Sequence, residues 1–178
     1  MSTARISELA EKQKTHNSQG VRFSTYATDY IYQGKCFSCS QRLSVGGSSS
    51  LIVLFNMVPA YALGRQISVY TPVFDANNGP ITVDYYAGSD YTGGTVMTIN
   101  NRAYYGELPG CTLTYGATGS SKGTKFSEGY VVAGHKSSGS SQEGLEFVPS
   151  QNTNILVELT NTDGSAAIIY VSFVWFEV

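Results

Sequence analysis

Two histidines are the only imidazoles that this chain could use for acid–base or nucleophilic chemistry. His16 lies in a polar stretch, and His135 precedes a Gly/Ser-rich segment. A Ser/His/Asp triad needs a histidine held beside its nucleophile, and the chain has no Gly-x-Ser-x-Gly motif that would supply one. The sequence therefore gives little support for such a triad, and we predict no catalytic residues.

Carboxylates offer a second route to chemistry, because a glycosidase works with two of them roughly 5 to 10 Å apart. Most of the candidates fall on the polar side of alternating segments, where a solvated carboxylate is the ordinary state. No spacing marks a pair, so a polysaccharide hydrolase is the weakest of our functional hypotheses. The candidates are Asp84, Asp90, Glu107, Glu143, Glu146 and Glu158.

Cys36 and Cys39 have the Cys-x-x-Cys spacing of half a zinc site, to which Cys111 and His135 could add ligands. No second Cys-x-x-Cys or His-x-x-His pair completes the pattern. The two cysteines also fall in a predicted strand, where positions i and i+3 point to opposite faces, which argues against a disulfide between them. We expect reduced thiols packed as small apolar groups, and we predict no metal and no cofactor.

Composition narrows the partners that the protein can have. The chain has 178 residues, which suits one domain, and its formal net charge is -2. Charged residues make up 13% of it, so a broad basic face for nucleic acid is not expected. No apolar run reaches the roughly 18 residues of a transmembrane span, and the first twenty residues lack the apolar core of a secretory signal. We therefore expect synthesis in a cytosol and no membrane partner.

From Val21 onward the hydrophobic period is two, which is typical of β-strands. Residues 81–85 alternate apolar and polar side chains, and we interpret residues 155–159, in which Glu158 is the polar position, as a strand of the same kind. The run 168–176 is apolar on both faces except at Ser172, so we expect both of its faces to be covered. Further strand candidates are residues 35–43, 51–57, 66–74, 95–99, 111–115 and 126–133.

Turn residues separate these runs and indicate the fold class. Asn77-Asn78-Gly79 and Thr162-Asp163-Gly164 are signals for tight hairpins, because Asn, Asp and Gly tolerate positive φ. About eight to ten short strands with regular turns predict an all-β, antiparallel β-sandwich or barrel. We favour a sandwich over residues 21–178 with Greek-key order, hence a jelly roll.

Residues 1–20 form a separate, more highly charged segment that we interpret as an N-terminal arm. A short helix over residues 4–14 fits the spacing of its apolar residues, and a polar linker follows it. The arm is either a frayed terminus or a segment, helical or extended, that orders on a neighbouring molecule.

Tyrosine is the strongest compositional excess, with 13 residues. Five of them gather around two predicted loops, where they could line a sheet, stack on sugars or form a protein contact. They are Tyr85, Tyr86, Tyr91, Tyr104 and Tyr105.

The order of several motifs resembles a known family. Residues 79–86 read Gly-Pro-Ile-Thr-Val-Asp-Tyr-Tyr, and Gly-Gly-Thr at 93–95 and Asn-Asn-Arg at 100–102 follow. Phe-Val-Pro at 147–149 and the closing Trp-Phe-Glu at 175–177 continue that order. Over roughly residues 79–177, with a looser match from Tyr32, the chain is similar to the jelly-roll capsid decoration (cement) proteins of tailed bacteriophages.

The resemblance implies a structural virion protein without catalytic residues. Such a protein is made in the host cytoplasm, binds the outer surface of an icosahedral phage head, and bridges subunits of the major capsid protein. It also implies self-association as a dimer or trimer. An alternative hypothesis is a receptor- or glycan-binding module of a phage fibre or tail. The expected capsid or subunit contacts are Arg5, Leu9, Lys12, Lys14, Tyr104, Tyr105 and Trp175.

Overall fold

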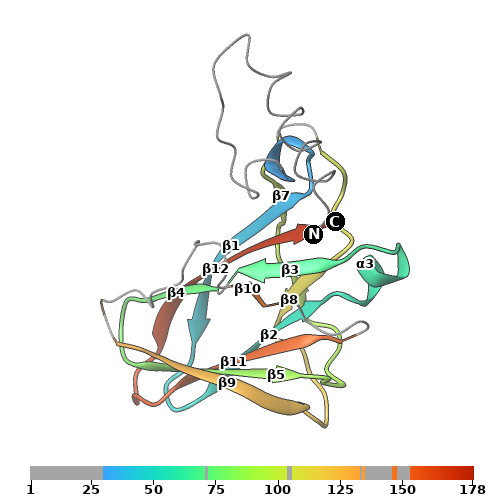
Figure 1. Ribbon diagram of the computed structural model, residues 1–178. Helices are drawn as coiled ribbons and strands as arrows, with labels where there is room; N and C mark the ends of the chain where they lie inside the picture. The colour runs from blue at the N-terminus through green and yellow to red at the C-terminus, as the bar shows by residue number, and fades with distance from the viewer. Residues whose placement is uncertain (1–29, 71, 104–105, 133, 135–145, 148–152) are drawn as a thin grey trace, which may run out of the picture.

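The protein folds into two antiparallel β-sheets packed face to face (Figure 1). The structure is a computed structural model that describes residues 30–70, 72–103, 106–132, 134, 146–147 and 153–178. The first sheet contains β1 (Cys36–Val45), β3 (Ile67–Tyr70), β4 (Val73–Ala76), β7 (Asn100–Asn101), β10 (Glu146–Phe147) and β12 (Ala167–Glu177). The second sheet contains β2 (Ser50–Asn56), β5 (Ile81–Ala87), β6 (Thr95–Val96), β8 (Thr112–Tyr115), β9 (Thr124–Val131) and β11 (Ile155–Asn161). A short helix, α3 (Val58–Ala62), lies between β2 and β3.

The strands are paired as in a long hairpin that has been rolled up. Strand β1 pairs with β12 and β2 pairs with β11, while β3 pairs with β10 and β5 with β9. Strands β12 and β11 then join the inner pairs by bonding to β3, β4 and β5. This is the strand order of a jelly roll, and it confirms the all-β antiparallel sandwich predicted from the alternating sequence.

The prediction of two tight hairpins is wrong, because each of these turns joins strands of different sheets. The turn at Asn77–Gly79 leads from β4 in the first sheet to β5 in the second, and the turn at Thr162–Gly164 leads from β11 to β12 across the same gap. Both turns use the residues that tight reversals need, and Gly79 has a φ of +75°. Turn chemistry identifies a reversal of the chain, but it does not specify whether the next strand stays in the same sheet.

Two predicted strands also differ in extent from those in the structure. The predicted strand 66–74 is two strands, β3 and β4, with Pro72 between them. Proline has no N–H to donate to a ladder, which explains a break at this place. The predicted strand 95–99 is reduced to the two residues of β6.

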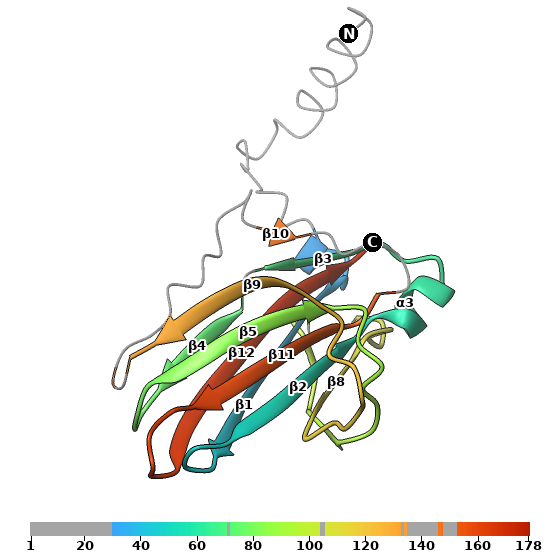
Figure 2. The ribbon, with the colours of Figure 1, turned by 90° about the horizontal axis from the view of Figure 1, so that it is seen from below.

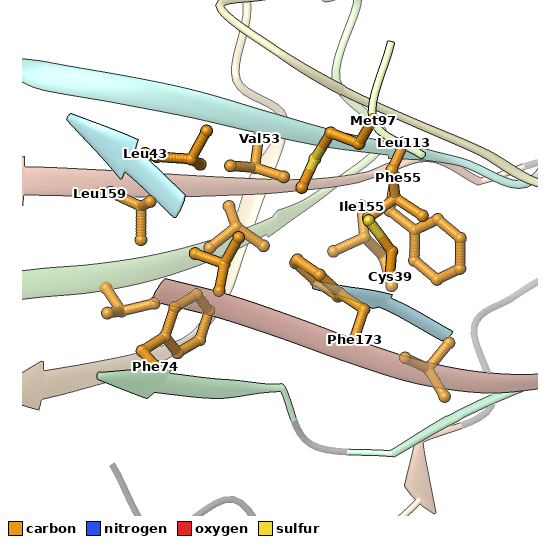
Figure 3. Close-up of a cluster of buried hydrophobic side chains, with 14 of the residues drawn as sticks. Cys39, Leu43, Val53, Phe55, Phe74, Met97, Leu113, Ile155, Leu159 and Phe173 are labelled. Carbon is orange, nitrogen blue, oxygen red and sulfur yellow. The ribbon is translucent and has the colours of Figure 1, made fainter. Parts of the chain in front are cut away.

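The core lies between the sheets and is aromatic at its centre. Phe173 of β12 has its ring centroid 6.1 Å from that of Phe55 in the opposite sheet and 6.3 Å from that of Phe74 (Figure 3). The ring of Trp175 meets Phe55 edge-on at 5.1 Å. All four side chains are almost completely buried. Burial of this much apolar surface is the main stabilising contribution to such a sandwich.

The outer face of β12 is covered less than its sequence predicts. At its end Phe176 is buried, with its ring centroid 5.6 Å from Tyr30 and 5.3 Å from Tyr70. Further along the same face Tyr170 is 47% exposed and lies under the guanidinium of Arg42. Both faces of this strand are apolar, but only the inner face is buried along its whole length.

Candidate functional site

Of the seven contact residues predicted from the sequence, the structure describes only Trp175. Arg5, Leu9, Lys12, Lys14, Tyr104 and Tyr105 lie outside the described residues, as does the predicted arm. The prediction that Trp175 contacts a partner is wrong, because its side chain is fully buried between the sheets. Its indole Nε1–H donates to Glu177 Oε1 at 3.0 Å, so both the ring and its polar group are used inside the fold.

The three cysteines are free and buried, and His135, which the sequence offered as a fourth ligand, lies outside the described residues. Cys39 packs in the core between the sheets, whereas Cys36 packs on the opposite face of β1 against Tyr70 and Phe176. Burial raises the pKa of Cys36 and of Cys39 to about 11, which keeps both thiols protonated near neutral pH. Within the described residues no three His, Cys, Asp or Glu side chains gather in a way that would hold a metal ion. The prediction of opposite faces for the two cysteines is confirmed.

The structure brings together two of the candidate carboxylates, Asp84 and Glu158. Their spacing in the sequence did not mark them as a pair. Asp84 of β5 lies directly opposite Glu158 of β11, and Glu128 of β9 lies opposite Asp84 on the other side. Opposite positions on antiparallel strands hold their Cβ atoms about 4.5 to 5.5 Å apart. These three residues, which we call the acidic row, lie on the outer face of the second sheet.

Two lysines form ion pairs with the three carboxylates of the acidic row. Lys122 Nζ lies 2.6 Å and 2.8 Å from the two carboxylate oxygens of Glu158. Lys125 Nζ lies 3.0 Å from Asp84 Oδ1 and 2.8 Å from Glu128 Oε2. The hydrogen bonds to these carboxylates raise the pKa of both lysines, and the bond from Lys125 lowers the pKa of Glu128. Each carboxylate of the acidic row has a lysine partner, so this pairing favours a structural role for the row.

The remaining candidate carboxylates also have structural partners or lie outside the description. Asp90 accepts hydrogen bonds from the backbone N–H groups of Ser120 and Ser121 at 2.9 Å each. Glu107 pairs with Arg65 at 2.8 Å. Glu143 is outside the described residues, and the side chain of Glu146 in β10 is not described.

Glu177, which sequence analysis overlooked, is the most deeply buried carboxylate of the described residues. Its Oε2 accepts from Arg65 Nη1 at 2.6 Å and from the Gly110 backbone at 2.7 Å. Its Oε1 accepts from the Cys111 backbone and from Trp175 Nε1, both at 3.0 Å. Burial raises the pKa of Glu177, but the bonds from these four donors outweigh burial and hold the pKa below its usual value. The carboxylate therefore locks the end of β12 to the segments after α3 and before β8 (Figure 1).

The predicted tyrosine cluster divides between the core and the surface. Tyr85 points inward, with its ring centroid 6.3 Å from that of Phe74, and burial raises its pKa. Tyr86 points outward, and its hydroxyl donates to Glu158 Oε2 at 3.3 Å. Tyr91 packs on the same outer face against the buried cluster of Leu54, Ala117 and Leu156. Of the described tyrosines in this group, Tyr91 is therefore the best placed to meet a ligand.

Strand β9 forms an exposed edge of the second sheet. Seven of its eight residues are exposed. Phe126 is 49% exposed, Tyr130 is 60% exposed, and Val132 follows just after the strand in a similar state. We call these three residues the β9 edge surface. An edge strand with exposed aromatic side chains is a typical place for another chain to bind, because its backbone can extend a sheet and its rings bury a large area.

A second group of exposed apolar side chains lies near α3 and the C-terminus, which are neighbours in both ribbon views (Figures 1 and 2). Leu63 follows α3, Leu108 precedes β8, and Val178 follows β12, and all three are exposed. The Arg65 side chain links these segments, because it donates to the Leu108 carbonyl oxygen as well as to Glu177. We call this group the α3-end patch.

Comparisons with known proteins add little to this description. No protein-family model and no curated protein matches the sequence. Among solved structures, the mosquito-larvicidal Cry4Aa toxin from Bacillus thuringiensis is similar over 79% of this chain, with 6% sequence identity and a TM-score of 0.21. The chain spans 18% of the length of that toxin chain, and similarity at this level supports no conclusion about function. Among the described residues, no helix has the length and apolar character to cross a membrane.

Proposed function

We propose that this protein is a capsid decoration protein that binds the outside of an icosahedral phage head. In this proposal it bridges neighbouring major-capsid subunits, associates with copies of itself, and resides on the exterior of the virion. The order of the motifs between residues 79 and 177 supports the family, and the jelly-roll strand order agrees with it.

The β9 edge surface is the structural observation that carries this proposal. Phe126 and Tyr130 expose aromatic rings on an edge strand that contributes only Val131 fully to the core. Tyrosine buries a large area at a low cost in side-chain entropy and is enriched where protein interfaces bind most tightly. A protein that holds a shell together needs such contact area rather than reactive groups.

The chemistry of the described residues supports a structural role in a second way. The carboxylates of the acidic row are paired with Lys122 and Lys125, and Glu177 is engaged by four donors. The thiols of Cys36 and Cys39 are protonated and buried. These contacts engage the groups within the fold, which supports a structural role.

Replacing Tyr130 by alanine is expected to weaken attachment to heads by at least about tenfold, which is the effect of removing an interface anchor worth 1.4 kcal/mol or more. The measurement is co-sedimentation of the purified protein with undecorated heads across a concentration series in the micromolar range. The melting temperature should stay close to that of the wild type, because the ring is mostly exposed.

The matched control is Tyr170→Ala, which removes an exposed tyrosine from the opposite sheet. It should leave attachment unchanged. Failure of the wild-type protein to sediment with heads at micromolar concentration would contradict the proposed function. Equal losses in the two variants would show that the β9 edge surface is not the contact.

Deleting residues 1–20 is expected to weaken attachment while changing the melting temperature by no more than a few degrees. The reason is that the arm has a thin apolar stripe that is better suited to ordering on a neighbour than to docking on its own domain. The same sedimentation assay and a thermal melt test this expectation. A large fall in melting temperature would show that the arm belongs to the core.

A further inference from the structure

A pocket of about 260 Å³ opens on the outer face of the second sheet, beside β2 and β8. Its floor contains outward side chains that lie in register on neighbouring strands. Val96 of β6 lies opposite Thr114 of β8, and Thr114 lies opposite Leu54 of β2. In the next row, Thr112 lies opposite Asn56. Figure 2 shows the loops that surround β8 at this edge of the sandwich.

One wall of the pocket is the segment from Tyr91 to Gly94, which is fixed in place by the rest of the fold. Thr92 and Thr118 exchange backbone hydrogen bonds of 3.0 and 3.1 Å. The carboxylate of Asp90, just before the wall, accepts two backbone hydrogen bonds from residues 120 and 121. Gly94 has a φ of +89°, and a Cβ there would lie 2.6 Å from the Tyr115 carbonyl oxygen. The wall is therefore already formed before any ligand binds.

Two residues that line the pocket each have a buried polar atom with no hydrogen-bond partner within the described protein. These atoms are Thr114 Oγ1 on the floor and Asn154 Oδ1, which lies just before β11. Asn56 differs from them, because its Oδ1 accepts the backbone N–H of Val58 at 3.1 Å. A buried polar atom without a partner is destabilising, so two of them at one pocket point to a bound molecule that completes their hydrogen bonds.

The lining defines the chemistry of that molecule. None of the described residues that line the pocket is charged, so nothing there would pair with a phosphate, a carboxylate or an ammonium group. Hydroxyl and amide groups from Thr92, Thr112, Thr114 and Asn154 provide donors and acceptors, and the Tyr91 side chain provides an aromatic surface. Neutral hydrogen-bonding groups beside an aromatic ring suit a ligand with several hydroxyl groups and an apolar ring face.

We propose that this pocket binds a single neutral sugar unit of a glycan. Its volume falls just below the range of about 300 to 1,000 Å³ that encloses drug-sized ligands, which favours one sugar ring over a long oligosaccharide. The inference does not rest on attachment to a capsid, because the pocket and the β9 edge surface share no residue.

The direct test is protein-observed NMR of the purified chain with neutral sugars at up to 20 mM. The probes are the methyl glycosides of glucose, galactose, mannose, N-acetylglucosamine and N-acetylgalactosamine, with glucuronate and N-acetylneuraminate as charged counterparts. We expect at least one neutral sugar to shift the resonances of residues 91–96 and 112–114, and the charged sugars to bind at least tenfold more weakly. Absence of shifts with all five neutral sugars at 20 mM would overturn the proposal.

Two variants separate ligand binding from folding. Thr114→Val removes the buried hydroxyl but keeps the shape of the side chain, so the melting temperature should stay the same or rise while sugar affinity falls about fivefold or more. Tyr91→Ala should lower affinity at least tenfold. Thr114→Val remains informative if Tyr91→Ala fails to fold.

The control is Thr82→Val, which removes a hydroxyl from the outer face of β5 away from the pocket. It should bind sugar like the wild type. Wild-type affinity in both Thr114→Val and Tyr91→Ala would mean that any sugar binds elsewhere, and it would overturn the assignment of this pocket.

Discussion

Replacing Glu177 by glutamine is expected to lower the free energy of unfolding by about 3 to 5 kcal/mol, the usual cost of breaking a buried charge pair from one side. The glutamine side chain has nearly the same shape, but its NH₂ group would face donors where the carboxylate now accepts. Arg65 would also lose its buried counter-charge. For a domain of this size the expected fall in melting temperature is roughly 10 °C. Urea unfolding followed by tryptophan fluorescence measures the change, since Trp175 is the only tryptophan and contacts this carboxylate.

The same substitution should alter the dependence of stability on pH. The folded protein holds the pKa of Glu177 below its usual value of 4.5, so its contribution to stability is present above about pH 4.5. That contribution is lost as the pH falls through the lowered pKa, because the proton then binds to the folded state as well. The wild type should therefore lose stability more steeply than the variant below pH 4.5.

Glu107→Gln is the matched control for Glu177→Gln, because both carboxylates pair with the same guanidinium of Arg65. The Glu107 side chain is 64% exposed, and exposed ion pairs contribute about 1 kcal/mol or less. A Glu177→Gln protein whose stability lies within 1 kcal/mol of the wild type would contradict the view that this carboxylate locks the end of β12.

Truncating Phe173 to alanine is expected to lower the free energy of unfolding by about 3 to 5 kcal/mol, the usual range for a buried phenylalanine. Its ring lies between Phe55 of the opposite sheet and Phe74 of its own sheet, so its removal leaves a cavity bordered by both sheets (Figure 3). Thermal and urea unfolding at neutral pH measure this loss.

Phe126→Ala serves as the control for Phe173→Ala, since it removes the same atoms from a position that is 49% exposed. We expect a cost below about 1.5 kcal/mol there, because much of the ring is already in contact with solvent. Similar losses in the two variants would show that β9 is packed as firmly as the centre of the sandwich.

Period-two alternation predicted a large part of this fold because it reports directly on which face of a sheet a side chain occupies. It placed Cys36 and Cys39 on opposite faces of one strand, and the structure confirms this. The same reasoning failed for Trp175. The final strand is apolar on both faces, so neighbouring residues such as Val174 offer no contrast that would identify the inner side.

The ion pairs and the pocket could not be predicted from the sequence, because they join residues that are far apart in the chain. Glu177 and Arg65 are 112 positions apart, and Lys122 and Glu158 are 36 apart. No local pattern encodes such pairs. The pocket residues Thr114 and Asn154 are ordinary strand and loop residues in sequence, and only the register of β8, β2 and β11 places them beside one opening.

The pairing of β1 with β12 has a consequence for the biosynthesis of the protein. Strand β12 lies in the middle of the first sheet, between β1 on one side and β3 and β4 on the other. Until β12 has been synthesised, β1 lacks the strand that joins it to β3 and β4, and slow, non-local β-pairing of this kind leaves a nascent chain prone to aggregation. A premature stop shortly before Ala167 should therefore yield an insoluble product rather than a shortened functional one.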